Sequence, residues 1–179
     1  FSSGFSKRLR DHHCLVDDRY VKAEVDLIVA LNLFLKEHRQ YNLKIYLHPI
    51  EKKNETEFNF CKNECSTFLI DCKDQVSFGA ISENTINTFL TIDTAISTSS
   101  TLNFERLFCG YKTLFAPIGM DPSPFEGTVI KNICINRELD FNSKLLESLQ
   151  LSEEEFISKN QLEGFYYSGV NLDNGTKTK

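Results

Sequence analysis

The sequence predicts an α/β fold with a Rossmann-like, doubly wound and mostly parallel sheet. Short apolar runs of strand length alternate with segments of helical spacing about five times, and the connections between them are short. The 179 residues, 41% of them hydrophobic, are enough for one domain of ordinary size with a real core. Right-handed crossovers would bring the strand ends and the helix starts to one edge of such a sheet.

The first half of the chain begins with the clearest helix of the sequence. Residues 17–38 carry one apolar stripe, formed by Tyr20, Ala23, Leu27, Leu31, Phe34 and Leu35. Residues 43–47 alternate apolar and polar side chains, which predicts a strand. The charged residues 51–57 predict a solvated loop, and the mixed pattern of 58–71 favours a helix.

The second half predicts further strands and helices in alternation. We expect strands at 76–80, 92–97, 112–118 and 129–135, and helices at 82–90 and 102–109. Gly110 stands just past the end of the last of these helices, where glycine is common. The two prolines in 120–127 indicate a surface loop. From Asp140 onward, two polar-faced helices are expected with a break near Leu151.

The predicted domain boundaries follow from this order. Residues 1–140 form the α/β domain, and 141–168 form helices that pack on it or on a missing amino-terminal half. Residues 169–179 are expected to be a frayed tail. The chain starts without methionine, and Phe1-Ser2-Ser3-Gly4 looks like the tail of a strand, so we expect a fragment of a longer protein.

Charge and cysteine usage narrow the class of protein. The formal charge of −5 is spread along the chain, which argues against a nucleic-acid partner. No run approaches the roughly 18 apolar residues of a transmembrane segment. The first residues show no signal-peptide pattern, so we expect a cytoplasmic protein. A peripheral location at the inner membrane is also compatible with the sequence. The six cysteines have no zinc spacing and are expected to be reduced thiols, with no metal bound.

A run of hydroxyl residues follows the strand expected at 92–97. Ser99, Ser100 and Thr101 stand where the next helix begins. The first amides of a helix have no partner within it, and the helix dipole adds partial positive charge, so this point suits a phosphate. The alternative is that Ser99 or Ser100 only caps the helix, which is the usual role of serine there.

A histidine ends the strand expected at 43–47. Pro49 follows His48 and biases it toward an extended backbone. In open α/β sheets ligands gather at the carboxyl ends of the strands, so His48 and the hydroxyl run are predicted to face one site. The alternative is that the His-Pro pair only ends the strand with a turn and has no chemical role.

Together these motifs resemble the carboxyl-terminal half of GT-B glycosyltransferases. The resemblance rests on His48-Pro49 after a strand, then Asp93 and Ser99-Ser100-Thr101, then a helix that ends at Gly110 before the strand at 112–118. It covers roughly residues 1–140. More narrowly, the His-Pro and Ser-Ser-Thr pair is similar to bacterial sialyltransferases of lipooligosaccharide and capsular polysaccharide synthesis.

The resemblance implies a nucleotide-sugar donor, with CMP-sialic acid favoured, and a glycan acceptor. His48 would be the catalytic residue near the donor phosphate, and Ser99, Ser100 and Thr101 would bind its oxygens, with Pro49 beside them. Transfer would invert the anomeric centre without a metal or other cofactor. The family's acidic catalytic base, which lies in the amino-terminal half, has no counterpart here, so this chain alone is expected to be inactive.

Five further residues are candidates for contacts with the donor. Glu105, one turn into the helix, is placed to reach ribose hydroxyls, or it only complements the helix dipole. Ser3 and Gly4 would line the cleft from the other side. Ser82 and Glu83 stand where such folds contact the base, although helix capping is their alternative role.

Two other classes of function remain open. A sugar-nucleotide epimerase shares the GT-B fold and would prefer UDP to CMP. A noncatalytic α/β interaction domain would use Ser99 as a cap, with His48 satisfied by its neighbours.

Overall fold

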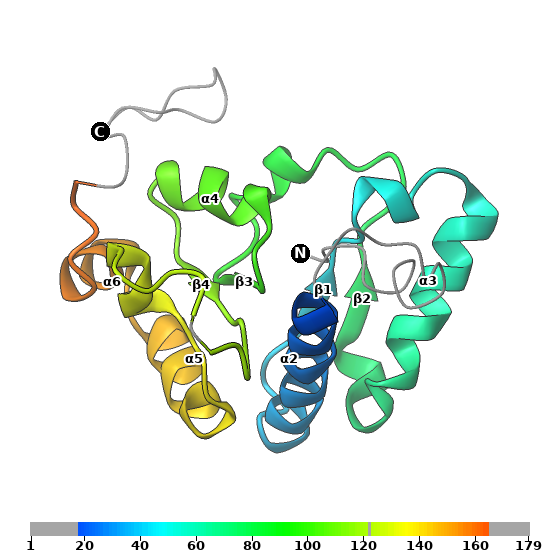
Figure 1. Ribbon diagram of the computed structural model, residues 1–179. Helices are drawn as coiled ribbons and strands as arrows, with labels where there is room; N and C mark the ends of the chain where they lie inside the picture. Colours follow the sequence, from blue (N-terminus) through cyan, green and yellow to red (C-terminus); the bar gives the residue numbers. More distant parts are fainter. Residues whose placement is uncertain (1–17, 122, 165–179) are drawn as a thin grey trace.

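The chain folds into a mixed α/β structure with two small parallel sheets (Figure 1). The computed structural model describes residues 18–121 and 123–164. Strand β1 (Leu43–Ile45) pairs with β2 (Val76–Phe78), and β3 (Ala95–Ser97) pairs with β4 (Thr113–Phe115). An isolated parallel bridge joins Phe115 to Cys134 on the far side of β4.

Five α-helices of the described chain surround the strands. They are α2 (Asp18–Glu37), α3 (Glu55–Thr67), α4 (Thr101–Phe108), α5 (Phe141–Gln150) and α6 (Glu153–Lys159). Short 3-10 helices connect them: η1 (Pro49–Glu51), η2 (Ile70–Gln75), η3 (Thr85–Thr88), η4 (Val129–Ile133) and η5 (Glu138–Asp140). In Figure 1, α2 and α3 lie with β1 and β2, whereas α4, α5 and α6 lie with β3 and β4.

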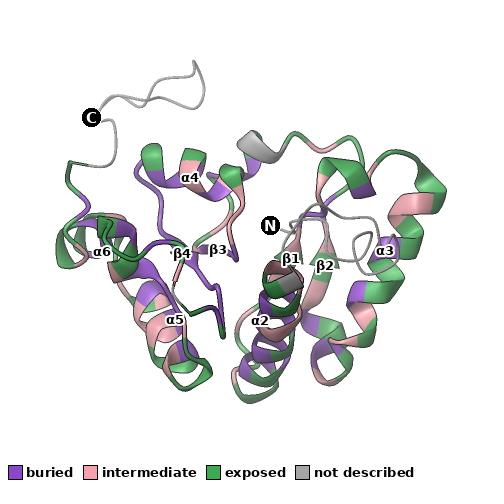
Figure 2. Cartoon of the chain, in the orientation of Figure 1, coloured by how far each residue is buried: buried purple, intermediate pink, exposed green. Residues whose placement is uncertain are grey.

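One apolar core joins the two sheets. It unites Phe34 of α2, Phe115 of β4, Phe141 of α5 and Phe156 of α6, all at most 2% exposed. Figure 2 shows the buried positions along α2 and around β4. Each such side chain contributes about 1.5–3 kcal/mol by burial, so packing rather than the three-residue strands holds the sheets together.

The main features of the predicted order are confirmed. The helix at 17–38 corresponds to α2, the strands at 43–47 and 76–80 to β1 and β2, and the strand–helix–strand segment at 92–118 to β3, α4 and β4. The two helices after Asp140 are also present, and the break at Leu151 is confirmed. The five described cysteines are all free thiols.

Four predictions need correction. The 129–135 strand is wrong: Val129–Ile133 is a 3-10 helix, with i to i+3 bonds such as the Lys131 amide to the Thr128 carbonyl. The helix expected at 82–90 shrinks to η3. The loop expected at 51–57 ends early because the Asn54 side chain caps α3, accepting from the Glu57 amide at 2.9 Å. Strand β3 starts only at Ala95, since the carbonyls of Ile92 and Asp93 bind an arginine instead.

Candidate functional site

The segment between β3 and α4 carries the predicted hydroxyl cluster. The Ser97 hydroxyl accepts from the Ser100 amide at 3.1 Å, which turns the chain sharply from strand to helix. Thr98 is only 1% exposed, and its hydroxyl has no hydrogen-bond partner among the described residues. Ser99 and Ser100 are half-buried and Thr101 is exposed. A buried hydroxyl without a partner is uncommon in native structures and calls for an explanation.

Ser100 is the N-cap residue of α4, but its side chain does not cap the helix. Its backbone is extended, with φ −65° and ψ 133°, and its hydroxyl accepts no bond from the first turn. The Asn103 amide bonds instead to the Ser100 carbonyl at 3.1 Å. The capping role that serine usually has at this position is therefore absent here, and the positive end of the helix dipole is left without an oxygen from its own cap.

Arg106 fixes the position of α4. This side chain is fully buried, and its guanidinium donates to four backbone carbonyls, those of Phe89, Ile92, Asp93 and Lys112, at 2.6–3.2 Å. The planar five-donor group suits such a cluster, and it also packs over the rings of Phe89 and Tyr111. Burial lowers the pKa of Arg106 to about 10, which still leaves it charged at neutral pH.

His48 begins the η1 turn. Its Nδ1 accepts from the Ile50 amide at 3.2 Å, while the Glu51 carboxylate accepts from the His48 amide at 3.0 Å. The two residues form a capping box around Pro49, with Glu51 fully buried. In a neutral imidazole only one nitrogen carries a proton, so an accepting Nδ1 places the proton on Nε2.

The remaining predicted site residues have other surroundings. Glu83 accepts from Lys44 Nζ at 2.7 Å and from the Ala80 amide at 3.0 Å, and the bond to Lys44 is the largest cause of its lowered pKa. It therefore ties the loop after β2 to β1. Ser82, Pro49 and Glu105 are exposed. Ser3 and Gly4 lie outside the described residues.

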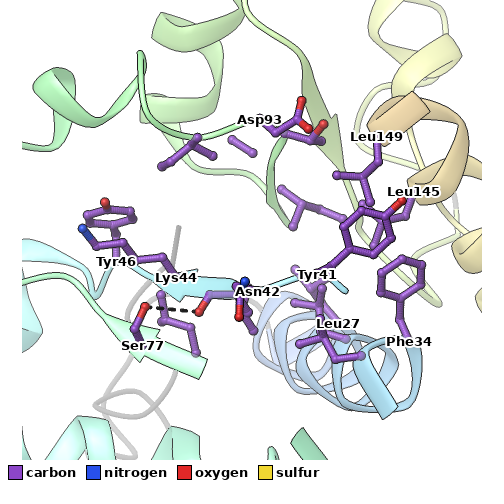
Figure 3. A pocket seen from close by; sticks show the side chains of 18 of the residues that line it. Leu27, Phe34, Tyr41, Asn42, Lys44, Tyr46, Ser77, Asp93, Leu145 and Leu149 are labelled. Atoms are coloured by element: carbon purple, nitrogen blue, oxygen red, sulfur yellow. Dashed lines mark hydrogen bonds between the residues drawn. The ribbon is translucent and has the colours of Figure 1, made fainter. Parts of the chain in front are cut away.

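A cavity of about 520 Å³ lies between β1 and β3 (Figure 3). Figure 3 shows Lys44 and Tyr46 at one end and Phe34, Leu145 and Leu149 at the other. Neither His48 nor residues 99–101 line it. No described contact joins His48 to those hydroxyls.

Sequence reasoning missed two residues that shape this region, Arg106 and Glu51. Arg106 lies three residues after Asn103, which is also buried, so an arginine on the inward face of an amphipathic helix was the available indication. Glu51 stands three residues after His48, the spacing of a capping box with histidine in place of serine or threonine.

No protein-family model, curated protein or solved structure matches this chain. Within 18–121 and 123–164, three or more histidine, cysteine or acidic residues nowhere gather in a way that would hold a metal ion. None of the described helices is long and apolar enough to cross a membrane.

Proposed function

We propose that this chain is the donor-binding half of a metal-independent glycosyltransferase, with a Rossmann-like sheet, and that it binds the phosphate of a nucleotide sugar at the start of α4. CMP-sialic acid is the favoured donor. The observation that carries the proposal is the N-cap of α4, where Ser100 holds the capping position without using its hydroxyl to cap.

The surroundings of this helix start suit an anion. The first turn of α4 contains no acidic residue. Ser99, Ser100 and Thr101 supply hydroxyl donors, and the buried Thr98 hydroxyl adds a donor without a partner in the described chain. Helix amides and the helix dipole favour a phosphate at such a point.

The chain connection also suits a ligand at this place. Strand β3, helix α4 and strand β4 form a parallel β–α–β unit, because β3 and β4 pair in parallel register from Ala95–Thr113 to Ser97–Phe115. Ligands of open α/β sheets bind beyond the carboxyl ends of the strands, where the next helix begins. The hydroxyl run occupies this position on β3.

One hydrogen bond of the His48 ring supports the catalytic role that we propose for it. With Nδ1 accepting from the Ile50 amide, Nε2 carries a proton that it can donate to a phosphate oxygen. In glycosyl transfer, negative charge grows on the departing phosphate, so such a donor stabilises the transition state more than the ground state. Loss of one donor of this kind commonly costs about 3 kcal/mol of barrier.

A nucleotide titration of the ¹⁵N-labelled chain tests the proposal. CMP and CMP-sialic acid should shift the amide resonances of Ser99 to Asn103 and the His48 ring, with UDP and GDP weaker. Ser158→Ala, an exposed serine of α6, is the control and should bind like the parent chain. Shifts scattered over the surface, or none at millimolar CMP, would contradict the proposal.

A transfer assay tests where the catalytic base lies. Because the described residues and the sequence offer no counterpart of the family's acidic base, we expect no transfer of sialic acid to a glycan acceptor by this chain alone. Robust transfer would show that the base is within these residues. A stronger response to UDP than to CMP would instead favour an epimerase.

One observation favours a noncatalytic interaction domain as the second candidate. His48 already has a structural role, because it caps η1 together with Glu51. If that is its only role, His48→Asn, which keeps an accepting side chain, should leave every ligand response unchanged. On the glycosyltransferase proposal the same variant weakens the response to CMP.

A further inference from the structure

Helix α2 presents one row of exposed side chains. Most of its side chains between positions 22 and 36 are buried or half-buried, and the exposed ones are Lys22, Val29, Leu33 and Lys36. Together with the half-buried Asp26 they follow one another at intervals of four, three, four and three residues. Side chains at these intervals form a single stripe on a helix, and paired helices contact each other through such stripes. We call these five residues the α2 seam.

The middle of the α2 seam is an apolar pair. Val29 is 38% exposed and Leu33 is 45% exposed, whereas the opposite face of the helix lies in the core. Ile70, which is 63% exposed, adds apolar surface beside the pair, because the side chain of the adjacent Asp71 is bound by Asn32 of α2 at 2.9 Å. Contact with another apolar surface would remove this area from water, which is favourable.

Opposite charges flank the apolar pair at equal distances along the helix. Asp26 stands three residues before the pair and Lys36 stands three residues after it. Within the chain, Asp26 forms an ion pair with Lys22, and Lys36 forms one with Asp71 at 3.5 Å. The side chains of Asp26 and Lys36 are still 30% and 54% exposed, so both are accessible to a charge from outside.

A second α2 helix that runs antiparallel matches this seam. Val29 then faces Leu33 of the second copy, and Leu33 faces Val29, because the stripes of antiparallel helices pair in opposite order. Asp26 faces Lys36 of the second copy at both ends of the contact. In a parallel arrangement each residue would face its own counterpart, so like charges would meet at Asp26 and at Lys36.

We propose that the α2 seam is the contact surface for a second copy of this chain, in a two-fold symmetric dimer with antiparallel α2 helices. The charge pattern identifies the occupant, because the seam is complementary to itself in this orientation. Across the contact, the charges of Lys22, Asp26, Lys36 of the second copy and Asp71 of the second copy alternate in sign. The inference uses no residue of the proposed donor site, so the nucleotide titration and the dimer succeed or fail separately.

Sedimentation equilibrium of the full 179-residue chain under reducing conditions tests the dimer. A contact built on one helix from each copy lies at the small end of specific interfaces, so we expect a weak dimer. The chain should pass from monomer to dimer between roughly 10 μM and 1 mM, with a dissociation constant of about 100 μM.

Charge reversal tests the pairing of Asp26 with Lys36. Asp26→Lys and Lys36→Asp each place like charges at both ends of the contact, so each should weaken self-association at least about tenfold. An equimolar mixture of the two variants should restore a dimer, because one chain then presents two positive positions and the other presents two negative ones.

Two control variants carry the same changes of charge outside α2. Glu154→Lys of α6 and Lys53→Asp before α3 alter exposed residues. Each should self-associate like the parent chain, and mixing them should bring no further association. Tighter association in this control mixture would show that net charge alone draws the chains together, which would contradict the specific pairing.

A matched pair of leucines tests the apolar middle without any change of charge. Leu33→Ser should weaken the dimer at least about tenfold. Leu90→Ser changes a leucine outside α2 that is 61% exposed, and it should leave the dimer unchanged. Urea unfolding of all the variants confirms that each is folded, and the leucine pair remains decisive if Asp26→Lys does not fold.

The orientation of the two copies can be read from intermolecular NOEs. In a 1:1 mixture of ¹³C-labelled and unlabelled chains, the methyl groups of Val29 should show NOEs to those of Leu33 of the second copy. NOEs from Val29 to Val29 and from Leu33 to Leu33 would mean a parallel pair and would overturn the proposal. A monomer at every concentration would overturn it too, as would a dimer that neither charge reversal nor Leu33→Ser weakens.

Discussion

Helices α4 and α6 both begin at a serine, and they use it differently. At the start of α6, the Ser152 hydroxyl accepts from the Glu155 amide at 3.2 Å, and the Glu155 carboxylate accepts from the Ser152 amide at 2.9 Å. At the start of α4, Ser100 occupies the same position with no side-chain capping bond. The same residue type therefore gives a closed helix start in one place and an open one in the other.

The two helix starts also differ in charge: α6 begins with acidic residues, and α4 does not. The first turn of α6 holds Glu153, Glu154 and Glu155, which complement the dipole and exclude other anions. The first turn of α4 holds none. A helix start without its own anion or cap is satisfied by something else, and this difference is why we place the ligand at α4.

The largest effect should come from the residue that anchors α4 in place of a cap. Arg106→Met keeps much of the volume but removes the guanidinium donors of four carbonyls, of which the Lys112 carbonyl keeps its bond from the Ala95 amide. We expect the free energy of unfolding to fall by about 3 kcal/mol or more, measured by urea denaturation. Arg106→Lys, which keeps one charge and fewer donors, should lie between. A loss under about 1 kcal/mol for the methionine variant would show that these bonds do not hold the helix.

The second prediction concerns ligand binding at the two serines. Ser100→Ala removes a proposed phosphate donor and should weaken CMP-sialic acid binding about tenfold, equivalent to about 1.4 kcal/mol, as followed by NMR titration. Ser152→Ala should leave the affinity unchanged, because α6 begins with three carboxylates. Equal affinities for the parent chain and Ser100→Ala would remove Ser100 from the site.

The third prediction reverses the roles of the same two variants. Ser152→Ala breaks a capping box and should lower the free energy of unfolding by about 1 kcal/mol, the usual cost of a lost serine cap. Ser100→Ala should change it by less than about 0.5 kcal/mol, because no capping bond is lost. Thermal or urea unfolding of the pair measures the difference. A cost of 1 kcal/mol at Ser100 would restore the capping interpretation.

The two serines also show which features of this fold can be predicted from the sequence and which cannot. The alternation of apolar runs was sufficient to place α2, β1, β2 and the β3–α4–β4 unit, because periodicity depends on local burial. The hydroxyl run was identified because it stands between the predicted strand and the predicted helix of that unit. The sequence could not tell that Ser152 caps and Ser100 does not, because capping depends on one backbone angle and on where a side chain turns.

The errors have long-range causes that no local pattern carries. Residues 92–94 read as strand, but the carbonyls of Ile92 and Asp93 are taken by Arg106, more than ten positions away. Residues 129–135 are apolar enough for a strand, yet their pairing with β4 is limited to the bridge between Cys134 and Phe115 and the bond from the Ile135 amide to the Phe115 carbonyl. Histidine at 48 was found, whereas the buried Glu51 that completes its capping box was not. The cavity between β1 and β3 arises from residues of six elements, α2, β1, α3, β2, β3 and α5, and no local sequence pattern predicts it.

The smallest predicted effect is a pH dependence confined to α6. Bonds from the amide and the hydroxyl of Ser152 lower the pKa of Glu155 below its ordinary value. A carboxyl whose pKa is lower in the folded state stabilises that state above its unfolded pKa, near 4.3, and loses this contribution as the pH falls through the folded value. Amide exchange in α6 should therefore quicken on acidification below about pH 4.3 more than exchange in α4, whose first turn has no acid. Glu155→Gln should reduce the excess, since the amide keeps an accepting oxygen but does not titrate over this range, whereas Glu153 and Glu154 still do. Equal acid sensitivity of the two helices would show that the capping box at Ser152 contributes nothing to the difference between them.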